Sequence, residues 1–171
     1  DVRASLGRRT PQLFGLSKQL GCTPSEAGAY IRNYLAKFPE LDAYMARLKD
    51  AARAQGYVTT YYGRKCVISG IHDKNGAKRQ FAERQAINAP LQGTAADIVK
   101  MAMVAVDHQI RTGQIRAKLL LQVHDELVLE VREADAPAVA AQVKAVMEGV
   151  ASFSIPLEVE AKWAKNWSDA H

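Results

Sequence analysis

The stretch from Ala117 to Val131 limits the possible folds of this chain more than any other part of the sequence. Two apolar runs, KLLLQV and LVLEV, stand on either side of the polar trio His124-Asp125-Glu126. Runs rich in leucine and valine, separated by so few polar residues, predict two buried strands joined by a tight turn, with the trio at the tip. The chain is therefore expected to contain a β-hairpin that holds a histidine and two acids together.

Helical patterns dominate the sequence before this hairpin. The segment Thr23-Pro24-Ser25-Glu26 is a capping box with proline at the first helical position, and the helix that it starts should end at Pro39. A second helix follows, marked by an apolar stripe up to Ala52, and Gly56 is suited to cap it. The tyrosines of these helices recur at helical spacing. We expect them to lie in or near the core rather than to stack on nucleic-acid bases.

The remaining segments predict two more helices and two further β elements. Residues 57–68 are rich in β-branched and aromatic side chains and predict a hairpin or strand-like loop with a basic tip. A long helix is expected from about Lys78 to Thr112, with a kink or break where Pro90 and Gly93 interrupt it. A helix over roughly 136–150 and a strand over 156–163 should follow. That strand and the 117–131 hairpin would share an antiparallel sheet, which makes the fold class α+β.

Composition excludes several classes of protein. The 171 residues suffice for one domain or two small lobes, and no stretch approaches the roughly 18 to 20 apolar residues of a membrane span. The first residues have no apolar signal-peptide core, and Cys22 and Cys66 form no metal-binding pattern, so a cytoplasmic protein is expected. Residues 1–80 carry 14 Lys and Arg against 6 Asp and Glu, whereas 81–171 carry 9 against 12. This asymmetry suggests one surface for phosphates and another for cations, or simply solvated helix faces.

The two adjacent acids at the predicted hairpin tip are candidate metal ligands. Mg²⁺ in proteins takes one or two carboxylates and completes its coordination with phosphate oxygens and water, so Asp125 and Glu126 suit it. The alternative is an ordinary solvated turn, because acids are common in turns. His124 beside the pair, and apolar strands on both sides, favour the metal site.

Two further groups of polar residues are candidate DNA contacts. Arg84, Asn88 and Gln92 are four residues apart, so a continuous helix would place them on one face. Such a row can contact minor-groove acceptors, which are nearly the same for every base pair, but it is also compatible with an ordinary polar face. A basic group around the first hairpin can bind phosphates or can belong to a solvated loop. Its members are Arg64, Lys65, Lys74, Lys78 and Arg79.

Taken in order, these segments resemble the family A DNA polymerases, the family of bacterial DNA polymerase I. GYVTTYYGRKC is similar to a segment of the fingers subdomain, and ERQAINAPLQGTAADIVK to the long helix that leads from the fingers into the palm. LLLQVHDELVLEV is similar to the third catalytic motif, FGLSKQLG to the segment after the nucleotide-binding helix, and NWSDAH to the carboxyl terminus. The resemblance covers roughly residues 13–171. It implies part of the fingers over 1–78 and the carboxyl-terminal half of the palm over 79–171.

The resemblance also implies roles for individual residues in template-directed 5′–3′ DNA synthesis. Asp125 would bind the two catalytic Mg²⁺ ions, for which Mn²⁺ can substitute, and Glu126 would assist. His124 would contact the primer strand. Further DNA contacts would come from Arg84, Asn88, Gln92, Arg64 and Lys65. The partners implied are primer–template DNA and a dNTP, with no membrane and a monomeric protein. The residues that bind the dNTP are not identified.

The sequence departs from the family pattern in three ways. The first palm motif, which supplies the other metal-binding aspartate, does not occur in these residues, and no thumb or exonuclease domain fits. The opening DVRASLGRRTPQL does not align with the nucleotide-binding helix, because it lacks a Tyr-Gly pair and its basic residues are wrongly spaced. An altered boundary or a divergent paralogue would explain this start, and the abrupt loss of similarity near residue 12 favours the boundary.

We therefore expect DNA synthesis from the parent protein, and only weak, salt-sensitive DNA binding from these residues alone. The main alternative is a non-catalytic DNA-binding module on a polymerase scaffold. A metal-dependent phosphodiesterase is less favoured, because no second cluster of carboxylates is visible.

Overall fold

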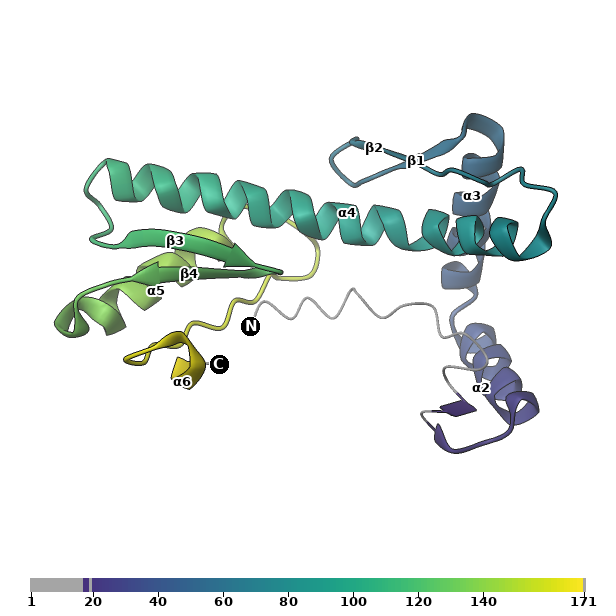
Figure 1. Ribbon diagram of the computed structural model, residues 1–171, viewed down its shortest axis with the longest axis horizontal. Helices are drawn as coiled ribbons and strands as arrows, with labels where there is room; N and C mark the ends of the chain where they lie inside the picture. Colours follow the sequence, from purple (N-terminus) through teal and green to yellow (C-terminus); the bar gives the residue numbers. More distant parts are fainter. Residues whose placement is uncertain (1–16, 19, 171) are drawn as a thin grey trace. The chain divides into compact units, whose positions relative to one another are not determined.

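The computed structural model describes residues 17–18 and 20–170 (Figure 1). The segment DVRASLGRRTPQL and part of FGLSKQLG lie outside the described residues. The chain divides into two compact units at the boundary between Thr94 and Ala95, which falls inside a helix. The elements of at least four residues are α2 (Pro24–Lys37), α3 (Pro39–Gln55), α4 (Gly76–Arg111), β3 (Lys118–Val123), β4 (Glu126–Glu130), α5 (Ala136–Glu148) and α6 (Trp167–Ala170). The three-residue elements are β1 (Tyr57–Thr59), β2 (Lys65–Val67) and the 3-10 helix η2 (Glu133–Asp135).

The ends of the first two long helices are set by local sequence, as predicted. The Thr23 hydroxyl accepts a hydrogen bond from the Glu26 backbone N–H at 3.3 Å, and the Glu26 carboxylate accepts one from the Thr23 N–H at 2.8 Å. Pro39 begins α3, and Gly56 caps that helix with a left-handed φ of 78°. Both helix boundaries expected from the sequence are therefore confirmed.

The capping box predicts a pH dependence of α2. Hydrogen bonds from the Thr23 N–H and hydroxyl lower the pKa of Glu26 below its ordinary value of 4.5. Because the folded pKa is the lower one, this contribution to stability is present above pH 4.5 and is lost as the pH falls through the folded pKa. An NMR titration of the Glu26 carboxyl carbon should show the lowered pKa. Thr23→Ala removes the hydroxyl bond but keeps the larger contribution of the backbone N–H, so it should return the pKa only part of the way toward the ordinary value. An ordinary Glu26 pKa in the unsubstituted chain would contradict the assignment.

The tyrosines of α2 are exposed, so the expectation of core or near-core positions was wrong for them. Tyr30 is 59% exposed and Tyr34 56%, whereas the buried residues of α2 are the small Ala27 and Gly28. Tyr44 in α3 is half-buried. Helical spacing places aromatic rings on one stripe, but it does not say whether another element covers that stripe.

The unit that ends at Thr94 has a core between α3, the β1–β2 hairpin and the first half of α4. β1 pairs antiparallel with β2, with Val58 opposite Cys66. The buried core residues are Ala52, Val58, Ile68, Ile71, Ala82 and Ala86. Three of the six are alanines, and their small side chains let the helix backbones approach the hairpin closely. The predicted first hairpin is therefore confirmed, and it lies against α4.

The sequence predicted a kink or break at Pro90 and Gly93, and helix α4 runs through both residues without a break. Proline lacks the N–H that an interior helical position needs. Contacts from the β1–β2 hairpin hold the helix just after that position. The Arg64 guanidinium donates to the Gly93 carbonyl at 3.0 Å, and the Tyr61 N–H donates to the Thr94 hydroxyl at 2.9 Å. We infer that these tertiary bonds outweigh the local helix-breaking tendency.

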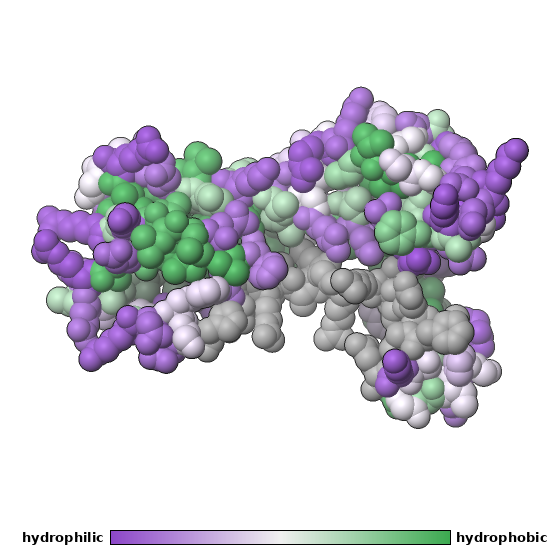
Figure 2. All heavy atoms as spheres, viewed as in Figure 1, coloured by the Kyte–Doolittle hydropathy of each residue, from purple (hydrophilic) through white to green (hydrophobic). Residues whose placement is uncertain are grey.

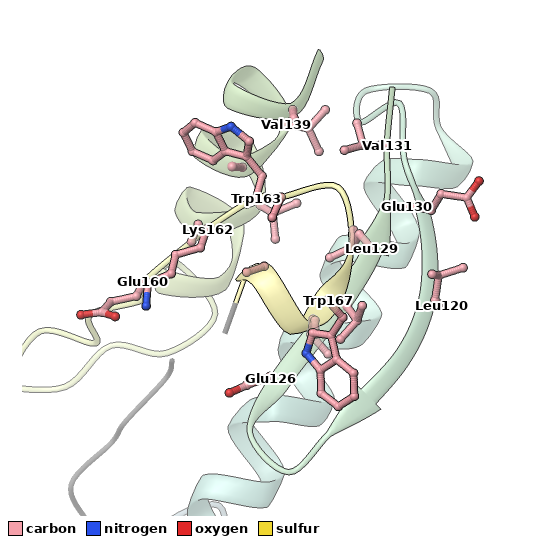
Figure 3. A pocket seen from close by; sticks show the side chains of 18 of the residues that line it. Leu120, Glu126, Leu129, Glu130, Val131, Val139, Glu160, Lys162, Trp163 and Trp167 are labelled. Atoms are coloured by element: carbon pink, nitrogen blue, oxygen red, sulfur yellow. The ribbon is translucent and has the colours of Figure 1, made fainter. Parts of the chain in front are cut away.

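The unit that begins at Ala95 has its core between the second half of α4, the β3–β4 sheet and α5. Its buried residues are Ala102, Val106, Ile115, Val139, Val143, Met147 and Val159. Leu129 of β4 and Val131, which follows that strand, pack against this core. Figure 3 shows both on the side of β4 that faces Val139 of α5, while Glu130 points to the other side. The predicted helix over 136–150 is confirmed as α5, with Asp135 at its N-cap position but without a side-chain capping bond.

Two expectations about the sheet of this unit were wrong. Residues 156–163 form no strand, and within residues 17–18 and 20–170 the β3–β4 sheet has only two strands. Val159 is buried as an extended strand residue would be, yet its N–H donates to the Glu148 carboxylate at 2.9 Å instead of to a strand. The strands are also not fully buried. Leu120 is 46% and Leu121 47% exposed, and Figure 2 shows apolar side chains gathered over β3 and β4.

None of the helices in the part of the chain that the structure describes has both the length and the apolar character needed to cross a bilayer.

Candidate functional site

The turn between β3 and β4 holds the trio where the sequence placed it. Val123 pairs with Glu126, so His124 and Asp125 alone form the turn. His124 has a left-handed φ of 52°, a conformation that costs a non-glycine residue about 1 kcal/mol. The side-chain amide of Gln122 donates to the His124 carbonyl at 2.7 Å and stabilises the turn. The paired strands thus hold Asp125 at the tip of a well-defined hairpin.

The donor set at this tip fits a magnesium ion only in part. His124 is exposed, and Asp125 and Glu126 are half-buried. Among the residues that the structure describes, there is no group of three or more His, Cys, Asp or Glu side chains suitable for a metal. The hairpin therefore supplies two carboxylates that are adjacent in the sequence, and Mg²⁺ takes one or two carboxylates when substrate phosphates and water complete its coordination. Its chemistry fits a hard cation that is shared with other ligands.

A cavity of about 680 Å³ lies beside the hairpin, between β4, α5 and the C-terminal segment. Of the trio, only Glu126 lines it; the other walls include Leu129, Val139 and Trp163 (Figure 3). The largely apolar side chains of these walls belong to the packing of the sheet on α5. The cavity is therefore not centred on the acids of the turn.

The three polar residues predicted to form a row on the long helix do so. Because α4 is continuous, Arg84, Asn88 and Gln92 follow one face at four-residue spacing. Arg84 and Asn88 are half-buried and Gln92 is exposed. The Arg84 guanidinium carbon lies 5.8 Å from the centre of the Phe81 ring. This row belongs to the unit that ends at Thr94, whereas the acidic turn belongs to the other unit.

The basic residues of the first hairpin have structural contacts that the sequence did not reveal. Arg64 donates to the Gly93 carbonyl, and the Lys65 ammonium lies 4.5 Å from the centre of the Tyr57 ring. Both residues are nevertheless exposed. Sequence reasoning missed the hairpin anchor formed by Gly93 and Thr94. A glycine inside a helical pattern was the available signal, because such a glycine often marks a close approach of two backbones.

Comparisons with known proteins agree with this architecture. The sequence model of the family described as DNA polymerase family A matches residues 11–169. DNA polymerase I of Pseudomonas aeruginosa is 51% identical over 158 residues, which cover 92% of this chain and 17% of that protein. DNA polymerase I of Deinococcus radiodurans is 44% identical over 154 residues, 90% of this chain and 16% of that protein. This chain thus spans about one sixth of the length of these relatives.

A solved structure also has a fold similar to that of this chain. It is the POL domain of Pol1 from M. smegmatis in complex with DNA primer-template and dNTP. The two structures superpose with a TM-score of 0.84 at 36% sequence identity, over 93% of this chain and 28% of that one. Since the family match spans nearly the whole sequence and the fold agrees with it, this chain belongs to DNA polymerase family A.

Proposed function

We propose that this chain is part of an enzyme that synthesises DNA on a template, by transferring nucleotides from a dNTP to a primer 3′-hydroxyl. The observation that carries the proposal is the position of Asp125 in the two-residue turn of the β3–β4 hairpin, within a chain that belongs to family A. The similar M. smegmatis domain is bound to primer-template DNA and a dNTP, which supports the same class of substrates here. The bacterial relatives support a cytoplasmic enzyme, and we propose that it acts as a monomer.

Within this proposal, residues 1–78 are part of the fingers subdomain and residues 79–171 the carboxyl-terminal half of the palm. The two compact units of the structure divide at Thr94 rather than at residue 78. Ala82 and Ala86 of α4, which follow residue 78, belong to the core of the unit that ends at Thr94.

The acidic turn is the proposed metal-binding part of the active site. Asp125 would hold the catalytic Mg²⁺, or Mn²⁺ in its place, and Glu126 would assist. When bound, such a metal lowers the pKa of the attacking hydroxyl and stabilises negative charge on the phosphates. The exposed His124, whose backbone conformation is fixed by the turn, would contact the primer strand. The stiffness of the paired strands supports these roles, because a metal ligand must be placed accurately.

The polar row on α4 is the proposed contact with the primer–template duplex. Arg84, Asn88 and Gln92 carry donors that match minor-groove and sugar–phosphate acceptors, so they would sense duplex shape rather than sequence. Arg64 and Lys65 would add phosphate contacts whose contribution falls as the salt concentration rises.

We further propose that these 171 residues alone bind DNA weakly and do not extend a primer. The described part of the chain holds no second group of acids that would complete the metal site. Electrostatic stabilisation of this kind is usually the largest catalytic term. A non-catalytic DNA-binding module is the alternative, and substitution of Asp125 separates the two.

The chain itself can be tested for both properties. We expect it to bind a primer–template duplex with an affinity that falls steeply with salt, and to incorporate no dNTP in a primer-extension assay. Replacing Arg84, Asn88 and Gln92 together with alanine should weaken binding about tenfold for duplexes of any sequence. The control Gln142→Ala/Lys144→Ala removes an amide and a cation from α5 and should change little. Robust nucleotide incorporation would refute inactivity, and equal effects of the two variants would refute the role of the row.

A further inference from the structure

The turn between β1 and β2 carries two exposed tyrosines that the proposed catalytic function does not use. Tyr61 is 68% exposed and Tyr62 43%. Their ring centres lie 5.2 Å apart at an interplanar angle of 84°, an edge-to-face pair. Neither residue belongs to the buried core of its unit. The turn thus presents aromatic surface to solvent.

The backbone that carries this pair is held rigidly. The Thr60 N–H donates to the Arg64 carbonyl at 2.9 Å, and the Gly63 N–H donates to the Thr60 carbonyl at 3.0 Å. The Tyr61 N–H is bonded to the Thr94 hydroxyl, which anchors the turn to α4. Tyrosine has few rotatable bonds, so a pair on a fixed backbone binds a planar ligand at low cost in conformational entropy.

The charged residues that flank the turn in the sequence are all basic. No acidic residue occurs in the sequence between Asp50 and Asp73, while Arg64 and Lys65 follow the tyrosines directly and are exposed. Flat apolar surface beside positive charge fits a polyanion that also carries planar rings. Nucleic acid meets both requirements. Duplex DNA keeps its bases stacked on one another, so unpaired DNA is the form that offers base faces to tyrosine.

We propose that the β1–β2 turn is a stacking platform for single-stranded DNA, with unpaired bases against Tyr61 and Tyr62 and phosphates near Arg64 and Lys65. The inference rests on the proposed function for its substrate and adds a contact separate from the α4 row. Ala82 and Ala86 are buried in the core that the hairpin shares with α4, while the row lies on another face of that helix. Because every base has an aromatic face, the platform accepts any template sequence.

Fluorescence anisotropy with the full chain tests the platform. The two probes are a labelled blunt DNA duplex and the same duplex with an unpaired extension of about five nucleotides. Tyr61→Leu/Tyr62→Leu keeps apolar bulk but removes the rings. It should weaken binding to the extended probe about tenfold and leave the blunt probe within about twofold. Tyr61→Phe/Tyr62→Phe should preserve both affinities. The matched control Tyr30→Leu/Tyr34→Leu removes two similarly exposed rings from α2 and should change neither affinity.

Each other outcome contradicts a defined part of the inference. If the unsubstituted chain binds both probes equally, the platform is refuted and the proposed DNA-binding function stands. If the chain binds neither probe, the platform and the proposed DNA-binding function are both refuted. Equal losses for the two probes in the Leu variant refute stacking. If that variant does not fold, NMR on the unsubstituted chain decides: the extended probe, but not the blunt one, should shift the ring resonances of Tyr61 and Tyr62. Unchanged ring resonances would refute the platform.

Discussion

Asp125→Asn in a polymerase that contains these residues is expected to lower the rate of nucleotide incorporation about 10³-fold. The substitution keeps the shape of the side chain and removes the charge that would hold the metal ion. Asp125 lies in a two-residue turn whose backbone is fixed by pairing of Val123 with Glu126, so the hairpin should keep its structure. The measurement is single-turnover primer extension at saturating dNTP. DNA affinity, measured in parallel, should be unchanged or slightly higher, because one negative charge is removed near the phosphates.

The matched control for this substitution is Asp135→Asn. Asp135 stands at the N-cap position of α5, but its side chain makes no capping hydrogen bond there, so the loss of its charge should leave catalysis within about twofold. If Asp125→Asn retained full activity, the acidic turn would not be the metal site. If the unsubstituted parent protein bound DNA but showed no synthesis, the non-catalytic module would be the correct interpretation.

Gly93→Ala is expected to destabilise the unit that ends at Thr94 by about 1–2 kcal/mol, although alanine favours helix more than glycine does. A Cβ at position 93 would lie 2.6 Å from the methyl carbon of Thr60, 3.2 Å from an Arg64 guanidinium nitrogen and 3.4 Å from the Cys66 sulfur. Thr60 is only 4% exposed and its side chain has little room to move. The added methyl group should therefore push the β1–β2 hairpin away from α4.

Two further variants test whether the close contact at position 93 causes the loss of stability: a double variant and a substitution of a second glycine. Thr60→Ser removes the clashing methyl group and keeps the hydroxyl that accepts from the Arg64 N–H at 3.1 Å, so it should restore much of the lost stability in combination with Gly93→Ala. Gly76→Ala lies in the same helix, where the nearest atom to a new Cβ is 3.9 Å away, and should be neutral or stabilising. Urea unfolding measures the stability of each variant, and hydrogen exchange of the Tyr61 amide is a local probe of the β1–β2 turn. Identical behaviour of Gly93→Ala and Gly76→Ala would contradict the close approach.

The same contact between the β1–β2 hairpin and α4 bears on why α4 has no break. Pro90 and Gly93 are helix-breaking residues by their own conformational preferences, and the sequence predicted an interruption from them. Their tertiary context reverses that preference. Position 93 needs glycine because a hairpin from a distant part of the chain lies against the helix there. A single sequence does not contain this information in any local pattern.

The last segment of the chain illustrates the same limit. Apolar residues alternate through Leu157, Val159 and Ala161, and this alternation correctly predicts one buried face. It does not specify the partner of the backbone groups. The Val159 N–H is satisfied by the Glu148 side chain, so an extended segment with a strand-like pattern is not a strand. The exposure of Tyr30 and Tyr34 has a similar cause, because periodicity defines a face and not what covers it.

What the sequence alone determined are the features set by interactions between near neighbours. These are the capping box at Thr23, the glycine cap at Gly56 and the turn that presents Asp125, where each signal and the group it satisfies are only a few residues apart. Only the tertiary structure decided the continuity of α4, the anchoring of the β1–β2 turn and the lack of a third strand beside β4 within the described residues. Those features depend on packing and hydrogen bonds between segments far apart in the chain, whose free energies can exceed local conformational preferences.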